Sequence, residues 1–460
     1  MKNLRYLLEP ESVAVIGASR DINSVGYGIL KGLTHGCVLP SPYAKKFAGK
    51  VYPVNPNATE ILGLPCFKSI LEVKESIDLA VIAIPAELVL QAVKECAKKK
   101  VKAIIIVSAG FGEMGVKGTK MQEEIKTLTK KNKIPLLGPN SLGLMNLEKN
   151  LNASFALSTP PLGNVVFLTQ SGALADSIID WALQEIYSFQ SIISLGNKAD
   201  LNESDFIDWY SKNKKTKAIT LYLESVSQGR TFFESIKNCV EKGKQVIVLK
   251  GGRTNAGLQA ASSHTGALSG DYEVFKAAVK QAGGINADTL EELFNLAKAF
   301  SMQPKAKGKN VAIITNGGGA GVLTSDYCEK HSLNIVPLTE KTIKTMDESK
   351  VMNPAYSRRN PLDLVGDALP ERFDVALNAV LKQEDVDSCI VIQTLQTMTD
   401  ALNDARMVVK AKKYGKPIAT VFMGGKYTRE AVLLLTKNNV PNYNDPEKAV
   451  KAIAALSGCK

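Results

Sequence analysis

Histidine, tryptophan and paired cysteines are scarce in this chain. Its 460 residues include three histidines, two tryptophans and 6% aromatic residues. The seven cysteines are scattered and none forms a Cys-x-x-Cys pair, so we expect no metal site, and the thiols suit a reducing compartment. No apolar run approaches the roughly 18 residues of a membrane span, and the first residues do not resemble a signal peptide. We therefore expect a cytoplasmic protein without a membrane partner.

The charge is strongly basic, because 57 lysines and arginines face 45 acids, which gives a net charge of +12. A basic chain is one signature of nucleic-acid binding. Here the lysine runs at 98–100, 130–131 and 214–215 fall mainly on predicted helix ends and loops, and aromatic residues are few. We interpret the excess as a solvated surface that attracts phosphate-rich ligands, and expect no nucleic-acid partner, since lysines also stabilise helix C-termini.

Strand and helix patterns alternate through the first part of the chain. Residues 12–17 form a continuous apolar run that ends in glycine, which is typical of a buried parallel strand. Residues 86–99 place Val89, Val93 and Cys96 on one face of a helix. The alternation predicts an α/β fold with a doubly wound parallel sheet. Its other strands are predicted at 51–54, 78–84, 102–107 and 134–137.

The turn after the first strand departs from a dinucleotide-binding fingerprint. Gly17 is followed by glycine only at Gly26 and Gly28, a gap too long for Gly-x-Gly-x-x-Gly. The second strand ends at Asn55, where NAD binding would require an acid. NAD is therefore disfavoured. The turn could hold the phosphates of another nucleotide, or serve packing alone.

A strand followed by a Gly-rich turn recurs near residues 12, 164 and 310, with linker-like stretches at 158–163 and 303–309. We expect three doubly wound, Rossmann-like or flavodoxin-like α/β domains in tandem, at 1–150, 160–302 and 308–460. Ser171 should cap a helix that runs to about residue 185, and the turn at 316–321 should open a helix to about residue 330. The later strands are predicted at 164–169, 189–194, 217–223, 245–249, 310–315, 388–393 and 417–422.

The stretch at 261–270, Ala-Ser-Ser-His-Thr-Gly-Ala-Leu-Ser-Gly, carries the strongest chemical signal. His264 stands there among small residues in a predicted loop, where backbone can approach a ligand, and a neutral imidazole can be a base, a metal ligand or a nucleophile. The Gly-rich turns around Ser171 and Gly317 could each present backbone N–H groups to an anion. The combination indicates phosphoryl transfer at nitrogen. The plainer interpretation is a histidine packed in a turn.

Glu224 follows the strand predicted at 217–223. In such folds ligands bind at the carboxyl ends of the strands. The carboxylate could accept a hydrogen bond from an imidazole and fix its tautomer. A surface acid at a strand end is the alternative.

Six motifs, in this order and spacing, resemble the α subunit of the NDP-forming acyl-CoA synthetases, in particular the archaeal ADP-forming acetyl-CoA synthetases, which are relatives of succinyl-CoA synthetase. The resemblance covers nearly the whole chain. The motifs are Ser-Val-Ala-Val-Ile-Gly-Ala-Ser at 12–19, Gly-Pro-Asn-Ser-Leu-Gly at 138–143, Thr-Gln-Ser-Gly-Ala-Leu at 169–174, Leu-Glu at 223–224, Ser-His-Thr-Gly-Ala-Leu at 263–268 and Asn-Gly-Gly-Gly-Ala-Gly at 316–321.

The resemblance implies roles for individual residues. The first domain would bind coenzyme A, with Gly17, Ala18 and Ser19 near its phosphates and Asn55 and Ser108 as further contacts. His264 would be the phosphorylated nucleophile, held and polarised by Glu224. Two helix N-termini would face the phosphoryl group, and their residues are Ser171, Gly172, Ala173, Asn316, Gly317, Gly318 and Gly319.

The resemblance also implies a reaction and a partner. Acyl-CoA, phosphate and ADP would give a carboxylic acid, ATP and CoA through an acyl phosphate and a phosphohistidine. The sequence shows no ATP-grasp domain, so ADP or ATP with magnesium is expected on a β subunit, in an α2β2 assembly. Alternatives are a related chain for a different acid and a CoA-binding regulatory module without turnover, against which the pair His264 and Glu224 counts. The three α/β domains leave no length for a fused acetyltransferase.

Overall fold

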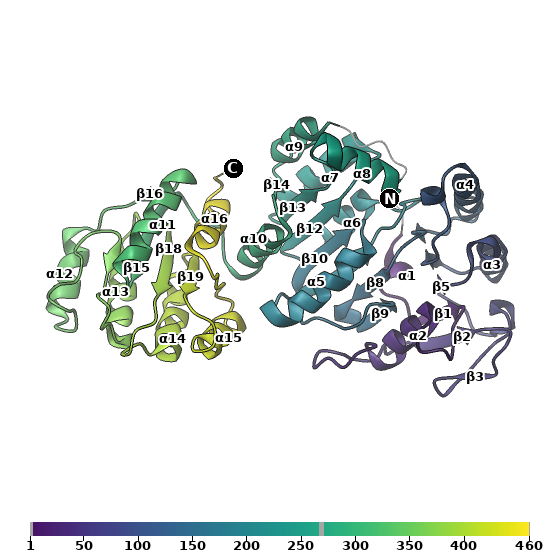
Figure 1. The fold of residues 1–460 in the computed structure, drawn as a ribbon, viewed down its shortest axis with the longest axis horizontal. Coiled ribbons are helices and arrows are strands. Elements are labelled where there is room, and N and C mark those ends of the chain that lie inside the picture. The colour runs from purple at the N-terminus through teal and green to yellow at the C-terminus, as the bar shows by residue number, and fades with distance from the viewer. Residues whose placement is uncertain (1–2, 266–270, 460) are drawn as a thin grey trace. The chain divides into compact units, whose positions relative to one another are not determined.

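The computed structural model describes residues 3–260 in full, the backbone of residues 261–265, and residues 271–459. The chain divides into two compact units, Met1–Asp288 and Thr289–Lys460 (Figure 1). The first unit contains a five-stranded, a seven-stranded and a two-stranded sheet, and the second a five-stranded sheet. The three-domain division at 1–150, 160–302 and 308–460 stays a prediction.

The first sheet has the strand order β2-β1-β5-β6-β7, and all its pairings are parallel. Every residue of β1 is buried. Val13 and Val15 pack in one core with residues of α2, whereas Ala14 and Ile16 pack in another with residues of α3. Both faces are covered, as expected for a doubly wound sheet. The elements of this part are α1 (Arg5–Leu8), β1 (Ser12–Ile16), α2 (Val25–His35), β2 (Lys50–Val54), β3 (Glu60–Ile61), β4 (Leu64–Pro65), β5 (Leu79–Ile82), α3 (Ala86–Lys99), β6 (Ala103–Ile106), α4 (Val116–Lys131) and β7 (Leu136–Leu137).

The second sheet has the order β14-β13-β12-β10-β11-β8-β9 and is mixed, because β8 pairs antiparallel with β11 and with β9. The antiparallel strands β8 and β9 were not expected from the sequence. The strands β8 and β9 are short and carry polar residues at buried positions, so no continuous apolar run in the sequence indicates them. The elements are β8 (Gly143–Asn146), β9 (Leu151–Ser154), β10 (Leu162–Thr169), α5 (Gly172–Glu185), β11 (Phe189–Ser194), α6 (Glu203–Tyr210), β12 (Ala218–Leu223), α7 (Gly229–Glu241), β13 (Gln245–Lys250), α8 (Asn255–Thr265), α9 (Tyr272–Gln281) and β14 (Ile285–Asn286).

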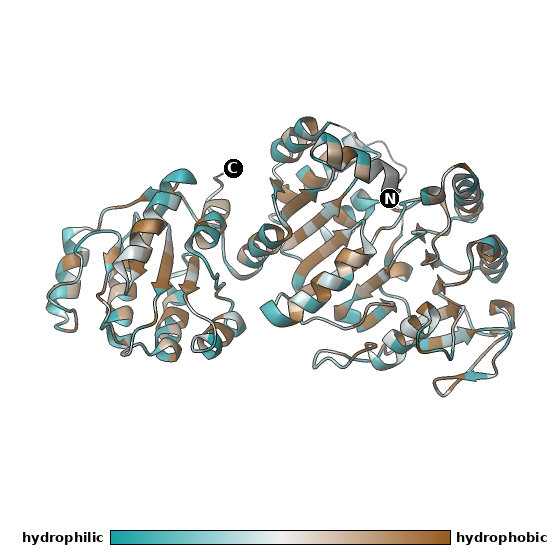
Figure 2. Cartoon of the chain, in the orientation of Figure 1, coloured by the Kyte–Doolittle hydropathy of each residue, from teal (hydrophilic) through white to brown (hydrophobic). Residues whose placement is uncertain are grey.

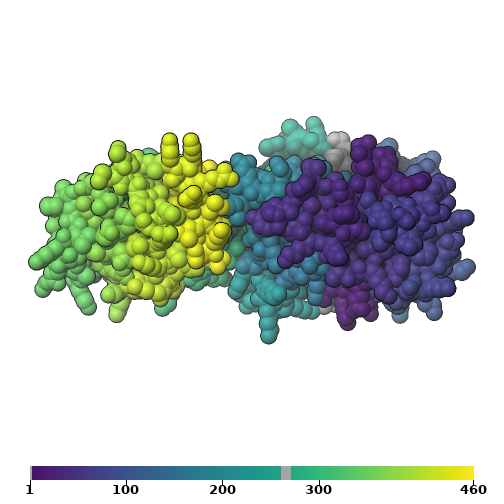
Figure 3. Space-filling view, turned by 90° about the horizontal axis from the view of Figure 1, so that it is seen from below, coloured from purple at the N-terminus to yellow at the C-terminus, as the bar shows by residue number. Residues whose placement is uncertain are grey.

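The two sheets of the first unit share a packed interior. A Cβ built at Gly28 on α2 would lie 3.2 Å from the Cβ of Phe155, just after β9, and one at Gly32 would lie 2.9 Å from the carbonyl oxygen of Asn152. Glycine therefore lets α2 approach the second sheet closely. Figure 3 shows the early residues, in purple, directly beside the blue and teal residues of that sheet.

The second unit is built on the order β16-β15-β18-β19, with β17 also paired to β15 and every pairing parallel. Most strands of the three larger sheets are coloured as hydrophobic, whereas the helices mix hydrophilic and hydrophobic residues (Figure 2). The elements are α10 (Leu290–Met302), β15 (Asn310–Thr315), α11 (Gly318–Lys330), β16 (Asn334–Ile335), α12 (Glu340–Glu348), β17 (Leu362–Asp363), α13 (Pro370–Lys382), β18 (Ser388–Gln393), α14 (Ala401–Ala411), β19 (Ile418–Phe422), α15 (Arg429–Lys437) and α16 (Pro446–Leu456).

The α/β class and the twelve main strands expected from the sequence are confirmed, each within two residues at either end. The stretch expected as a loop at 261–270 begins differently, because α8 continues to Thr265, after an alanine-containing run that favours helix. Residues 266–270 lie outside the described part of the chain. Among the described residues, no helix has both the length and the apolar character that a membrane span requires.

Candidate functional site

The turn after β1 is held tightly at the carboxyl edge of the first sheet. Gly17 has φ +93°, a left-handed conformation that favours glycine, and its N–H donates to the Val54 carbonyl at 3.0 Å. The side-chain amide of Asn55 donates to the carbonyl of Ala18 at 2.7 Å. Ser19 accepts a hydrogen bond from the Asp21 N–H at 3.1 Å. The structure therefore brings together four of the five residues expected to contact CoA.

The fifth, Ser108, follows β6 and lines a cavity of about 800 Å³ in the first unit. Its hydroxyl is hydrogen-bonded to both backbone groups of Ile84, at the end of β5. The same cavity is lined by the start of α5, so residues from the carboxyl edges of both sheets meet in one space. The lining residues are Val25, Ala83, Ile84, Pro85, Val107, Ser108, Ala109, Asn140, Ser141, Leu142, Phe155, Gln170, Ser171, Gly172, Ala173 and Asp176.

The amino terminus of α5 contributes a positive end to this cavity. Ser171 is the N-cap, as expected, and its hydroxyl accepts from the Leu174 N–H at 3.3 Å. Gly172 and Ala173 form the beginning of the first turn, where Ala173 is exposed and helix N–H groups have no intrahelical acceptor. Such N–H groups and the helix dipole favour an anion. The three residues expected to bind phosphate therefore lie together at a chemically suitable place.

Asp176 is an acid in the cavity wall, one turn further along α5. Burial raises the pKa of its carboxyl group, although the Leu157 N–H donates to it at 3.0 Å. A carboxylate here disfavours a negative charge on a nearby part of any molecule bound in the cavity.

Glu224 lies directly after β12 and is 7% exposed, so it is not the surface acid of the alternative interpretation. Tyr222 is hydrogen-bonded to its carboxylate, and the pKa of the Tyr222 hydroxyl is raised by burial and by the charge on Glu224. A Cβ built at Gly251 would lie 3.0 Å from the Tyr222 hydroxyl oxygen, so a larger residue there would require the hydroxyl group to shift.

His264 lies on α8, within the residues whose side chains are outside the described part of the chain. Its expected contact with Glu224 therefore stays a prediction. Among the described residues, no group of three or more His, Cys, Asp or Glu could hold a metal ion.

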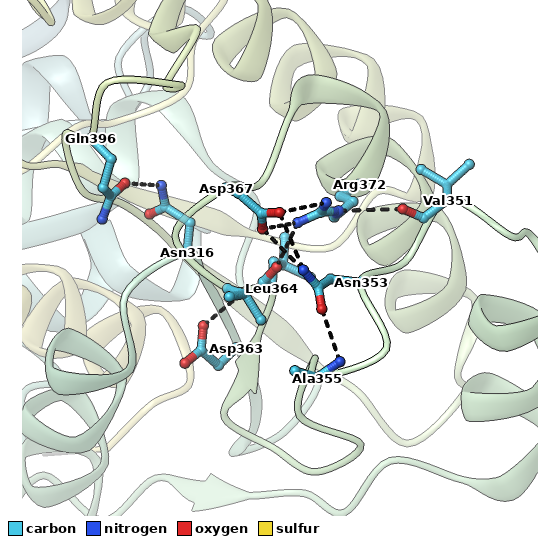
Figure 4. Close-up of polar contacts among 10 residues, drawn as sticks. Asn316, Val351, Asn353, Ala355, Asp363, Leu364, Asp367, Arg372 and Gln396 are labelled. Carbon is cyan, nitrogen blue, oxygen red and sulfur yellow. Dashed lines mark hydrogen bonds and ion pairs between the residues drawn. The ribbon is translucent and has the colours of Figure 1, made fainter.

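The remaining predicted residues lie in the second unit, at the carboxyl edge of its sheet (Figure 4). Asn316 is 1% exposed; its amide donates to the Thr394 carbonyl and the Gln396 side chain, both at 3.0 Å, and its oxygen accepts from the Thr394 N–H at 2.7 Å. Gly317 is the N-cap of α11 without a side-chain cap, and Gly318 and Gly319 are exposed in its first turn. The backbone of this turn can bind an anion, whereas the Asn316 side chain is occupied within the protein.

An acid borders the same turn, and a second acid lies further along the chain. Asp363 ends β17, and a Cβ built at Gly318 would lie 2.8 Å from its Oδ2 atom. Asp367 is paired with Arg372, which together with Asn353 holds the pKa of its carboxyl group below the usual range (Figure 4). A carboxylate beside a helix N-terminus is favourable electrostatically, and it also limits which anions the turn will accept.

Sequence reasoning did not single out Gln170, or Asn140 and Ser141 from the Gly-Pro-Asn-Ser-Leu-Gly motif. All three line the cavity. A usable signal existed, because each is a polar residue shortly after a predicted strand of a parallel sheet, where ligands bind. Asp176 carried no such signal, since its place depends on how α5 packs.

Two family models match the chain: a CoA binding domain over residues 11–146 and a succinyl-CoA ligase like flavodoxin domain over residues 162–300. The chain is 38% identical to the ADP-forming acetate–CoA ligase II subunit alpha of Pyrococcus furiosus, over 98% of this chain and 97% of the relative. It is 40% identical to the ADP-forming acetate–CoA ligase I of Archaeoglobus fulgidus over 98% of this chain, but spans only 63% of that relative's length.

Among solved structures, the chain is similar to the dinucleotide forming acetyl-coenzyme A synthetase 1 of Ca. Korarchaeum cryptofilum in complex with phosphate and ADP. The TM-score is 0.92 at 34% identity, covering 100% of this chain and 97% of the other.

Proposed function

The chain belongs to the family of ADP-forming acetate–CoA ligases, and from that premise we propose that it is the α subunit of an ADP-forming acetyl-CoA synthetase. The reaction is acetyl-CoA, phosphate and ADP to acetate, ATP and CoA. The observation that carries the proposal is the cavity in which Ser108 from one sheet and the open start of α5 from the next line the same space. That arrangement suits a thioester held beside a phosphate.

The coenzyme A moiety of the thioester substrate binds at the first sheet. Gly17, Ala18 and Ser19 are the candidates for its phosphate contacts, since a left-handed glycine at the start of a βα turn lets backbone approach an anion. Asn55 orders that turn through the carbonyl of Ala18, and Ser108 stands nearer the thioester end. The basic surface would help to attract this polyanion.

The chemistry runs in three displacements. An oxygen of phosphate attacks the thioester carbonyl carbon, and the C–S bond breaks to release CoA and leave acetyl phosphate. A ring nitrogen of His264 then attacks the phosphorus, and the P–O bond to the acetyl group breaks to release acetate. An oxygen of ADP attacks phosphohistidine, and the P–N bond breaks to give ATP and restore the imidazole.

The chain's residues stabilise the charge that gathers in these steps. Ser171, Gly172 and Ala173 offer backbone donors and a helix dipole without a competing nucleophile. Glu224 accepts from the far ring nitrogen of His264, which raises the nucleophilicity of the near one. Asn316, Gly317, Gly318 and Gly319 form a second phosphate-binding turn, on α11.

The nucleotide belongs to a partner. We propose a β subunit with an ATP-grasp domain, which holds ADP or ATP with magnesium, in an α2β2 assembly in the cytoplasm. Two relatives from Pyrococcus furiosus, each covered over 97% of its own length, are named subunit alpha, which supports a partner subunit. Acetate is proposed as the acid because Asp176 in the cavity wall disfavours dicarboxylates.

The test uses the protein purified with its partner. With radiolabelled phosphate and acetyl-CoA, we expect an acid-labile, base-stable label on this chain and ATP formation when ADP is added. His264→Ala should lose both. His35→Ala is the matched control, since His35 is an exposed histidine at the end of α2. Undiminished label in His264→Ala would refute the nucleophile, and CoA binding without any turnover would favour the regulatory module.

A further inference from the structure

Three polar side chains bind the backbone N–H and C=O groups of residues 224 and 225. The Oε1 atom of Gln170 accepts from the N–H of Glu224 at 2.6 Å and from the N–H of Ser225 at 2.9 Å. The Lys250 ammonium donates to the Glu224 carbonyl at 2.7 Å, and the Lys198 ammonium donates to the Ser225 carbonyl at 2.7 Å. Four main-chain groups that have left the sheet therefore find partners in three side chains.

These side chains come from consecutive strands of the second sheet. Lys250 is the last residue of β13, Glu224 follows β12, Gln170 follows β10, and Lys198 stands in the loop after β11. The sheet order β13-β12-β10-β11 places the four strand ends next to one another at one edge. The arrangement is thus built by the parallel topology rather than by one flexible loop.

The two lysines that bind this backbone are charged and buried. Burying them costs folding free energy, which is tolerated where the arrangement is needed. The Lys198 side chain and Lys250 are each 5% exposed. Burial lowers the pKa of the Lys250 ammonium, an effect that the negative charge on Glu224 opposes. A turn that only had to close could use one neutral donor, because burying an ammonium group carries a desolvation penalty of several kcal/mol.

Gln170 has a second attachment that the lysines lack. It directly precedes Ser171, the N-cap of α5, and it lines the cavity. Its amide Nε2 also lies 3.3 Å from the Ser225 hydroxyl. One side chain therefore links the open amides of α5 to the backbone that carries Glu224.

We propose that Gln170 is a positioning residue for phosphoryl transfer, which fixes the Glu224 carboxylate relative to the amides of α5 and keeps a neutral acceptor beside the phosphate. The inference rests on the proposed function, because the group it orients is the proposed partner of His264. Glutamine suits this place since a carboxylate of the same length would accept the same two N–H groups but repel the phosphate.

Two substitutions distinguish the positioning of Glu224 from the effect of a neutral acceptor beside the phosphate. Both are tested in the complex of the chain with its partner. Gln170→Met keeps the length and removes the acceptor, and we expect kcat for ATP formation to fall about 10- to 100-fold with the KM for acetyl-CoA unchanged, since small misplacements at a reacting centre cost that much. Gln170→Glu keeps the acceptor, and we expect the KM for phosphate to rise about 10-fold or more while kcat is largely kept. The matched control is Gln190→Met, since Gln190 is buried on β11 and hydrogen-bonded to Glu148 and Thr216.

The outcomes are distinct. A kcat of Gln170→Met within about twofold of wild type, or a loss no larger than in Gln190→Met, overturns the inference, as does an unchanged KM for phosphate in Gln170→Glu. If Glu224→Gln lowers kcat in the same series, the proposed function stands whether or not the inference about Gln170 is overturned. If the unaltered complex forms no ATP, the proposed function fails and this inference fails with it.

Discussion

The Lys198 ammonium lies 3.1 Å from the Glu203 carboxylate, and the two side chains are 5% and 1% exposed. Glu203 is the first residue of α6, where a negative charge also suits the helix dipole. The same ammonium donates to the Ser225 carbonyl. An ion pair buried this deeply ties the helix that follows β11 to the strand end that carries Glu224.

Removing the acid of that pair should destabilise the first unit. Glu203→Gln leaves a buried ammonium without its counter-charge, and we expect a loss of about 3 kcal/mol or more in the free energy of unfolding. Trp181 and Trp209 are the chain's two tryptophans and both lie in the first unit, so tryptophan fluorescence in a denaturant titration reports on this unit. Glu234→Gln, which breaks an exposed pair with Arg230, should leave the midpoint unchanged. Equal effects of the two variants would contradict the argument.

Gly17→Ala should be more harmful than an ordinary substitution of a left-handed glycine. A Cβ at Gly17 would lie 2.2 Å from the Ala83 carbonyl oxygen, in addition to the strain of φ +93°. Gly63 has φ +74° but nothing within 4 Å of its built Cβ. We expect Gly63→Ala to lower the free energy of unfolding by about 1 kcal/mol and Gly17→Ala to lower it by about 3 kcal/mol. Calorimetry should show weaker binding of CoA only for Gly17→Ala. Similar losses of unfolding free energy in the two variants would mean that backbone strain alone causes the destabilisation.

The strands could be predicted where both faces of a sheet are buried, because such strands are continuous apolar runs in the sequence. In β1, Val13 and Val15 serve one core and Ala14 and Ile16 another, so no polar residue interrupts the run. The strands β8 and β9 could not be found in this way. Asn146 and Asn152 are buried there because their amides donate to the carbonyls of Leu8 and Gly36. Such long-range partners leave no local periodicity in the sequence.

The site was predictable as far as it depends on strand ends. Ser171 and Glu224 follow strands of a parallel sheet, and the structure keeps them at its carboxyl edge. Lys198 and Lys250 gave no signal, because lysine is ordinarily a surface residue and their burial arises from neighbouring strands. Asn316, expected from the sequence as a phosphate ligand, is buried, and its amide is hydrogen-bonded to Thr394 and Gln396.

Asn316→Asp should therefore damage the second unit more than a single lost ligand contact would. The new carboxylate oxygen would face the Thr394 carbonyl and the Gln396 oxygen, where the amide now donates to both. We expect a loss of about 3 kcal/mol, because the buried carboxylate would face the Thr394 carbonyl oxygen without a donor between them. Hydrogen exchange with mass spectrometry should show faster uptake in peptides that cover β15 and β18. The control Asn334→Asp changes an exposed residue on the edge strand β16 and should leave uptake unchanged, and equally slow uptake in both variants would contradict the role of Asn316.

Asp404 makes the stability of the second unit depend on pH. It is 0% exposed on α14, and neither carboxylate oxygen has a hydrogen-bond partner within the described part of the chain. Burial, with smaller contributions from the charges of Asp400 and Glu371, raises its pKa to about 8. In the unfolded chain an aspartate titrates near pH 4, so between about pH 4 and 8 the folded unit binds one proton more than the unfolded unit.

Stability should then fall by about 1.4 kcal/mol per pH unit as pH rises through that window, and no further above it. Asp404→Asn keeps the shape and removes the ionisation. Calorimetric unfolding of the full chain should show the variant melting above the wild type at pH 8, with the difference shrinking steadily toward pH 5. A difference in melting temperature that does not change with pH would show that Asp404 ionises in the folded protein as readily as in the unfolded chain.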